Sequence, residues 1–190
     1  MNSKRRNRLL ILCLCLVVMV GCLLAAEMLE AQREAEDTAE TPTYTITNIT
    51  PDEIVEIGII RKEGESLNLK KEVEAWRCLE DSLIKLDTDT INSFLEDASS
   101  LISDTKIEDV NDLEQYGLEE PYLNVTLQLE NNMYVIKVGN YNSVISAYYV
   151  QIGDEPVVYT ITSTQYYQLN KALEDFELIE ETDSEVTVTE

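Results

Sequence analysis

The fold is decided by residues 112–152, which read DLEQYGLEEPYLNVTLQLENNMYVIKVGNYNSVISAYYVQI. Apolar and polar side chains alternate over residues 123–130. Because successive side chains of a β-strand point to opposite faces of a sheet, this alternation predicts a strand with one apolar face. Asn131-Asn132 follows this strand, and asparagine tolerates a positive φ. A two-residue turn and a β-hairpin are therefore predicted.

The predicted turn also sets the register of the hairpin. Counting outward from the turn, three apolar pairs share one face: Leu129 with Tyr134, Leu127 with Ile136 and Val125 with Val138. A slip by one residue would move one partner of each pair to the opposite face. Before the hairpin, Gly117 and Pro121 predict a tight entry turn. This turn would place Tyr116 and Leu118 at the end of the sheet.

Strand and helix patterns continue on both sides of this stretch. Further strands are predicted over residues 44–49, 54–62, 66–70, 106–110, 145–152 and 157–161. A helix with Asp87 as its N-cap is predicted by helical spacing of Ile91, Leu95, Ala98 and Ile102. A second helix, capped by Thr162 or Ser163, is predicted by an apolar stripe of Tyr166, Leu169, Leu173 and Phe176.

These elements predict an α+β fold. The short turns between strands favour a mostly antiparallel sheet meander with the two helices packed on it, preceded by an N-terminal transmembrane helix. Five segments are predicted: a basic cytoplasmic N-terminus over 1–8, a transmembrane signal anchor or lipoprotein signal over 9–26, an acidic spacer over 27–43, the α+β domain over 44–176, and an acidic disordered tail over 177–190.

Residues 9–26 form an uncharged apolar run. As a helix this run would extend about 27 Å, close to the hydrocarbon thickness of a bilayer. Basic residues precede it, so the positive-inside rule predicts a cytoplasmic N-terminus and an extracytoplasmic body. The anchor is either an uncleaved helix in the lipid bilayer or a lipid on Cys22, because Val20-Gly21-Cys22 resembles the end of a lipobox. Cleaved secretion is a third possibility.

The charge of the chain is strongly asymmetric. Beyond residue 26 the chain has ten basic and thirty-seven acidic residues, a net charge of −27. A body of this charge repels nucleic acids and anionic lipid surfaces. The sequence has no histidine, and Cys78 is the one cysteine beyond residue 26. An internal disulfide in the body, a cysteine metal site and histidine-based catalysis are therefore excluded.

No catalytic, cofactor-binding or metal-ligating residue is predicted. Asp87 and Asp89 lie where a calcium loop could begin, but an EF-hand would need glycine at Asn92 and glutamate at Ala98. Tyrosines are the remaining candidates, and the predicted interaction surface consists of Tyr116, Tyr141 and Tyr149. The alternative is that these rings are ordinary core or sheet-surface residues.

The order of motifs resembles the DUF4340 family, a bacterial domain family of unknown function, over residues 54–173. The motifs are DL, YGL and P in the entry turn, the alternating hairpin, then VGNYN, YYV and VVYTI, with Trp76 upstream. The resemblance implies a fold and carries no catalytic residues. It favours a strand over residues 75–79 with Trp76 facing inward, although helical spacing is also present at Val73, Trp76, Leu79 and Leu83. Some relatives are linked to membrane transport or gliding-motility systems.

The expected function is that of a membrane-anchored, extracytoplasmic, non-enzymatic domain. Such a domain would bind or support a membrane-protein partner, for which the resemblance suggests an ABC-type transport system. One alternative is a cell-envelope module that binds a ligand or a cation. The other is an envelope enzyme that uses carboxylates alone. No cofactor and no nucleic-acid partner are expected.

Overall fold

The computed structural model describes residues 42–64, 66–73 and 75–179, and most of its strands join one sheet. Within these residues, eight strands lie in the order β4-β3-β2-β7-β8-β9-β10-β6. All neighbouring pairs are antiparallel. The strands are β2 Ile54–Arg61, β3 Ser66–Glu72, β4 Ala75–Cys78, β6 Lys106–Ile107, β7 Leu123–Leu129, β8 Met133–Asn142, β9 Ala147–Ile152 and β10 Val158–Thr162. A separate short pair joins β1 (Tyr44–Thr45) to β5 (Ile102–Ser103).

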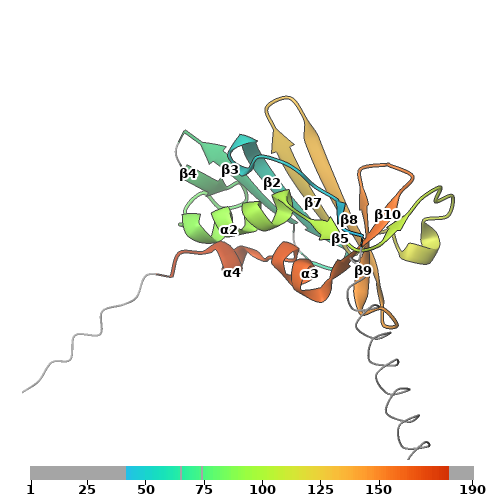
Figure 1. Ribbon diagram of the computed structural model, residues 1–190. Coiled ribbons are helices and arrows are strands. Elements are labelled where there is room, and N and C mark those ends of the chain that lie inside the picture. The colour runs from blue at the N-terminus through green and yellow to red at the C-terminus, as the bar shows by residue number, and fades with distance from the viewer. Residues whose placement is uncertain (1–41, 65, 74, 180–190) are drawn as a thin grey trace, which may run out of the picture. The chain divides into compact units, whose positions relative to one another are not determined.

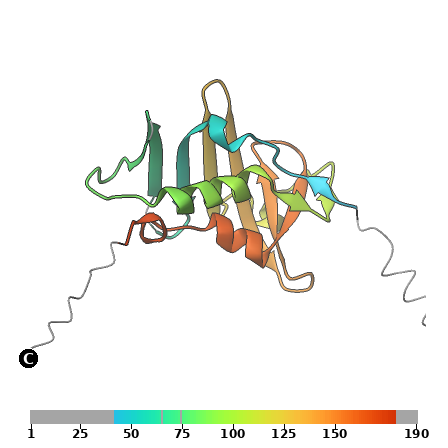
Figure 2. The same ribbon diagram turned by 60° about the vertical axis from the view of Figure 1, so that its left-hand side comes forward.

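The helices cover one face of the large sheet. These helices are α2 (Thr88–Ser99), α3 (Ser163–Leu169) and α4 (Leu173–Phe176), and both views show them on the same side (Figure 1, Figure 2). Two 3-10 turns, η1 (Pro51–Glu53) and η2 (Glu114–Tyr116), precede β2 and β7. The predicted α+β class, with a mostly antiparallel sheet and helices on one face, is confirmed for the described residues.

The main core lies between this face and the helices. The strands contribute alternate side chains, among them Ile57 and Ile59 of β2, Val125 and Leu127 of β7, and Ile136 and Val138 of β8. Helix α2 contributes Ile91, Phe94, Leu95 and Ala98, and the Phe94 ring meets the Phe176 ring edge-on at 5.5 Å. Trp76 is buried on β4, which confirms the predicted strand there. Asp87 accepts a hydrogen bond from the Asp89 N–H, which confirms the predicted helix cap.

A smaller packed region lies on the opposite face of the sheet. Tyr149 projects there, because its neighbours Tyr148 and Val150 both face the main core. The Tyr149 ring lies 4.8 Å from the ring of Tyr116, in the entry turn. A β-bulge in β8 brings Gly139 under this turn, where a Cβ atom on Gly139 would overlap the Tyr116 carbonyl oxygen. The entry turn is therefore packed on the sheet, with Leu118 buried.

The predicted hairpin exists, but its predicted register is wrong by two residues. The last pair before the loop is Gln128 with Met133, so that Leu127 pairs with Tyr134 and Val125 with Ile136. The loop therefore has four residues in place of two. Side chains hold it: the Gln128 Nε2 donates to the Leu129 and Asn132 carbonyls, and the Asn132 Oδ1 accepts from the Met133 N–H. A shift of two residues preserves the faces, so the apolar face was predicted correctly.

The single C-terminal helix that was predicted is two short helices. The N-cap is Thr162, as predicted, but α3 ends at Leu169 and α4 begins at Leu173. Arg61 of β2 holds the break, because its guanidinium donates to the Asn170 Oδ1 at 2.7 Å and to the Lys171 carbonyl. The Asp175 carboxylate then accepts from the Ala172 N–H at 2.7 Å and starts α4. A charged partner from a distant strand thus outweighs the local helical pattern.

Three predicted boundaries are also wrong. The strand predicted over 44–49 is β1, two residues long, and the strand predicted over 106–110 is β6, also two residues long. Ile102 is not on α2, which ends at Ser99, but begins β5. Residues 1–41, which include the predicted anchor and most of the predicted spacer, and residues 180–190 of the predicted tail lie outside the described residues. Within 42–64, 66–73 and 75–179, no helix has the length and apolar character needed to span a membrane.

Candidate functional site

Four tyrosine rings form a continuous ladder on the helix-bearing face. The Tyr141 ring of β8 lies 4.9 Å from the Tyr148 ring of β9. Tyr148 stacks on Tyr166 of α3, with ring centroids 4.0 Å apart and planes 11° apart. Tyr167 then meets Tyr166 edge-on at 5.3 Å. Two features position the ladder. Pairing of β8 with β9 places Tyr141 beside Tyr148, and the Thr162 cap starts α3 so that Tyr166 lies in its first turn, against Tyr148.

The ends of this ladder are exposed and continue into apolar residues. Tyr141 is 47% exposed and Tyr167 is 64% exposed. The loop between β8 and β9 adds Val144 and Ile145, which are 90% and 50% exposed. We call Tyr141, Val144, Ile145, Tyr148, Tyr166 and Tyr167 the tyrosine surface. Aromatic and aliphatic side chains exposed together on a soluble domain are typical of an interaction site.

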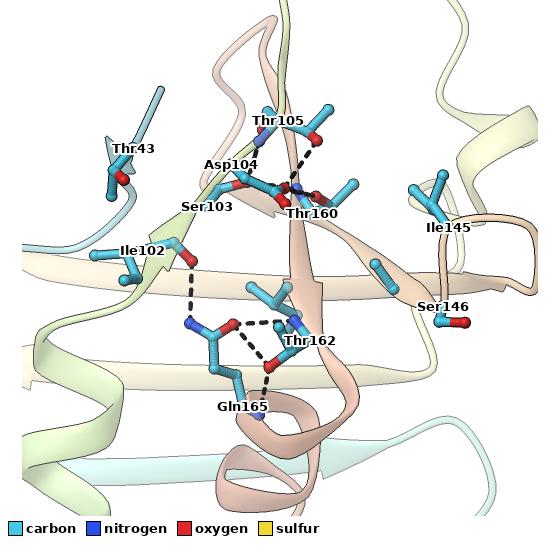
Figure 3. Close-up of a pocket in the computed structure, with 12 residues that line it drawn as sticks. Thr43, Ile102, Ser103, Asp104, Thr105, Ile145, Ser146, Thr160, Thr162 and Gln165 are labelled. Atoms are coloured by element: carbon cyan, nitrogen blue, oxygen red, sulfur yellow. Dashed lines mark hydrogen bonds between the residues drawn. The ribbon is translucent and has the colours of Figure 1, made fainter. Parts of the chain in front are cut away.

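A pocket of about 570 Å³ adjoins this surface. Figure 3 shows it between β5, β10, the start of α3 and the β8–β9 loop, with Ile145 and Ser146 on one side. Gln165 spans the gap between β10 and β5: its Oε1 accepts from the Thr162 N–H at 2.9 Å and its Nε2 donates to the Ile102 carbonyl at 3.0 Å. Side chains thus occupy the edge of β10 beyond its pairing with β6, and a partner strand cannot add there without displacing them.

The pocket offers little for catalysis. The Ser103 hydroxyl donates to the Thr105 carbonyl at 2.7 Å and accepts from the Thr105 and Thr160 backbone N–H groups. Asp104 is the one ionisable residue that lines the pocket, and its carboxylate accepts from the hydroxyls of Thr105 and Thr160. A nucleophile activated by a neighbouring base is therefore not formed by these lining residues.

Charge distinguishes the tyrosine surface from the rest of the domain. Residues 138–170 contain two charged residues, Asp154 and Glu155, in a chain that is 27% charged. Six of the ten tyrosines also lie in this stretch. Sequence reasoning missed this signal, because it treated the charge of the body as one quantity. A scan for long uncharged segments in an acidic chain would have found the surface.

The structure separates the three tyrosines that were predicted to act together. Tyr116 and Tyr149 pack against each other on the face away from the helices. Tyr141 lies on the helix-bearing face, with Tyr148. The Tyr149 hydroxyl accepts a hydrogen bond from the Asn142 Nδ2 at 2.7 Å, which ties it to the strand end. The three rings therefore lie on two faces of the sheet, and a role for each in binding stays a prediction. The predicted lipidation residue, Cys22, lies outside the described residues.

The phenols in the middle of the ladder stay protonated. Burial raises the pKa of Tyr148, and the neighbouring Tyr166 raises it further. Burial likewise raises the pKa of Tyr166, and Tyr167 adds to this effect. Since an unperturbed tyrosine titrates near pH 10, both rings are neutral at physiological pH. Tyr148 and Tyr166 thus form an uncharged stack whose hydroxyl groups can donate or accept hydrogen bonds.

Cys78 lies in a structural cluster at the other end of the sheet. Its buried thiol donates to the Glu80 Oε2 at 3.3 Å, and burial raises the pKa of the thiol. Burial alone would raise the pKa of the Glu80 carboxyl group, but hydrogen bonds from Asn68 and Cys78 outweigh it and lower that pKa. A buried thiol with a raised pKa is a poor nucleophile, so we assign Cys78 no catalytic role. The hydrogen bonds of the cluster join Asn68 of β3 to Glu80, in the segment that follows β4.

Calcium is expected to add nothing specific to stability. Asp87 and Asp89 belong to the α2 cap, and in the described part of the chain no group of three or more acidic, cysteine or histidine residues could hold a metal ion. Sodium chloride should raise the melting temperature by screening the acidic body, and millimolar calcium at matched ionic strength should raise it no further. Thermal unfolding monitored by circular dichroism measures the melting temperature in each salt. A saturable calcium effect at one-to-one stoichiometry would contradict this expectation.

Comparison with known proteins identifies a family for this chain. A family model described as a domain of unknown function, DUF4340, matches residues 76–178, which is more than half of the chain. The matched range begins at Trp76 on β4 and extends past α4, so it includes the hairpin, the entry turn and the tyrosine surface. No curated protein and no solved structure matches the chain.

Proposed function

The chain belongs to the DUF4340 family of domains of unknown function, and we propose that it is a membrane-anchored, extracytoplasmic domain that binds a membrane-protein partner through the tyrosine surface. The domain is non-enzymatic in this proposal. The partner class that the family resemblance favours is a transport system of the ABC type.

The observation that carries the proposal is the exposed tyrosine surface itself. Four exposed aromatic or aliphatic residues, Tyr141, Val144, Ile145 and Tyr167, gather where the domain has almost no charge. The centres of protein interfaces are depleted in charged residues and enriched in tyrosine. Stacking against Tyr148 and Tyr166 holds the rings before binding, which reduces the entropy lost when a partner docks.

Ionisable groups support a non-enzymatic role. In the described ranges, Asp97 is the one carboxyl group with a raised pKa, which burial causes and the neighbouring Glu96 increases. Its Oδ1 accepts from the Gln168 Nε2 at 2.9 Å, which holds α2 against α3. Glycoside hydrolases typically use two carboxyl groups that face one substrate, and the hydrogen-bond partner of Asp97 is an amide. Asp97 therefore serves the packing that supports the tyrosine surface.

The extracytoplasmic location is supported by the sequence. The basic residues of segment 1–8, the uncharged segment 9–26 and the acidic body follow one another in the order that the positive-inside rule assigns to an exported body. Protease added to intact spheroplasts should digest the body of the full chain, while a cytoplasmic control protein survives. Complete protection of the body would contradict the proposed location.

Photo-cross-linking in living cells tests the proposed binding surface. A benzophenone amino acid replaces Tyr167 in one variant of the full chain and Met133 in another. Met133 is 54% exposed and lies at the far end of β8, beside the four-residue loop. Light should join the Tyr167 variant to a membrane protein, identified by mass spectrometry, and should leave the Met133 variant without that adduct. Equal adducts from both positions, or none from Tyr167, would contradict the proposal.

A further inference from the structure

We infer that the partner of the tyrosine surface presents an uncharged, apolar centre surrounded by lysine or arginine residues. This inference rests on the proposed function, because it names the chemistry of the partner that the same surface binds. It commits to a protein different from this chain. A second copy of the chain and a lipid surface are outcomes that the experiment below distinguishes.

The centre of the partner surface follows from the residues that it must cover. Val144 and Tyr167 are largely exposed, and raised pKa values keep Tyr148 and Tyr166 between them uncharged. A partner charge placed against them would lose its hydration without gaining an opposite charge. Apolar side chains, by contrast, gain by removing these rings from water. The adjoining pocket, lined by Ile102, Ile145 and Ile161, can receive one such side chain.

The edge of the partner surface follows from the charges around the tyrosine surface. Asp104 lines the pocket beside Ile145, and Asp97, which has Glu96 next to it, is bonded to the residue that follows Tyr167. Three basic residues lie nearby: Lys106 pairs with Glu108 at 2.5 Å, Lys171 lies beside Asp97, and Arg61 donates to the Asn170 Oδ1 and the Lys171 carbonyl. Two sides of the surface thus carry more carboxylates than basic groups, and basic residues on the partner complement them.

The same charges disfavour the two other occupants. In a symmetric dimer each copy would place the same acidic edge against its partner, and like charges in contact weaken an interface. Residues 42–179 contain nine basic and twenty-six acidic residues, so the repulsion between two copies extends beyond the edge. An anionic lipid surface is repelled for the same reason.

The salt dependence of the cross-link tests the inference. The full chain with benzophenone at Tyr167 is kept in its native membranes and illuminated over a range of sodium chloride concentrations. The Debye length falls from about 30 Å at about 0.01 M to about 3 Å at about 1 M salt, so the attraction between opposite charges is lost across this range. The adduct yield should fall several-fold, and the peptide joined to residue 167 should lie among lysine or arginine residues.

Variants that remove single charges sharpen this test. Asp97→Asn and Asp104→Asn keep a hydrogen-bond acceptor for Gln168 and for Thr105 and Thr160, and each should flatten the salt dependence. Glu130→Gln, in the exposed loop between β7 and β8, should leave the salt dependence of the adduct yield unchanged. An adduct yield that is constant or rises with salt overturns the inference. An adduct between two copies of the chain, or with lipid, also overturns the inference about the partner. Such an adduct would still show that the tyrosine surface is a binding site. The absence of any adduct overturns the proposed function and this inference together.

Discussion

Replacing Leu127 with aspartate is expected to unfold much of the domain. Leu127 is 0% exposed and pairs with Ile57 on one side and Tyr134 on the other, within a core cluster of apolar residues. A carboxylate at this position is desolvated and has no basic partner in that cluster. An uncompensated buried charge costs about 3–5 kcal/mol, a large part of the stability of an ordinary domain. Urea unfolding followed by circular dichroism measures the loss.

Thr126→Asp is the matched control for Leu127→Asp. Thr126 precedes Leu127 on β7 and lies half-buried on the face away from the helices, beside Gly58. A charge there keeps its contact with water, so the cost should be about 1 kcal/mol or less. Similar losses for both variants would show that both faces of the sheet are covered at this strand, contrary to the structure.

Replacing Gly139 with alanine is expected to displace the entry turn. The new Cβ atom would overlap the Tyr116 carbonyl oxygen, and the atoms of Gly117 also lie within contact distance. Backbone atoms cannot move aside as a flexible side chain does, so the turn must lift from the sheet. Overpacking of this kind costs about 1–3 kcal/mol or more. Thermal unfolding measures the loss, and limited proteolysis near Gly117 reports the displaced turn.

Gly58→Ala is the control for Gly139→Ala. Gly58 lies inside β2, where a Cβ atom would stand 3.3 Å from the Asn68 Oδ1 and 3.5 Å from the Thr126 Cβ. Both neighbours are side-chain atoms, so a small adjustment should accommodate the methyl group. The melting temperature of the Gly58→Ala variant should therefore differ little from that of the unmodified protein. A Gly139→Ala variant as stable as Gly58→Ala would show that the entry turn does not pack on β8 as described.

Local patterns predicted which side chains face the core, but not the exact pairing. The alternation over residues 123–129 assigned the correct face to Leu127, because a strand has a period of two residues. The loop length was missed, because it depends on hydrogen bonds from the side chains of Gln128 and Asn132. The break after α3 was missed for a related reason. Arg61, which holds it, lies 109 residues from Asn170 in the sequence.

The candidate site was predicted only in part. Tyr148 and Tyr149 are neighbours on β9, so sequence alone indicates that they face opposite sides of the sheet. Which of the two joins a larger surface depends on α3, whose position follows from the fold of the whole domain. The lack of charge over residues 138–170, by contrast, is visible in the sequence. Charge counted in windows along the chain would have indicated this region without a structure.

The central claim is that the uncharged tyrosine surface binds the partner, and inserting a charge into it tests this claim most directly. Val144→Asp and Met133→Asp each replace an exposed apolar residue, one in the tyrosine surface and one at the far end of β8. Exposure of both positions keeps the effect on folding small. The measurement is the amount of the membrane complex that contains the full chain, separated on native gels after mild solubilisation. The account predicts that Val144→Asp removes the complex and that Met133→Asp retains it. A complex that survives Val144→Asp undiminished, or that both substitutions weaken equally, would contradict the account.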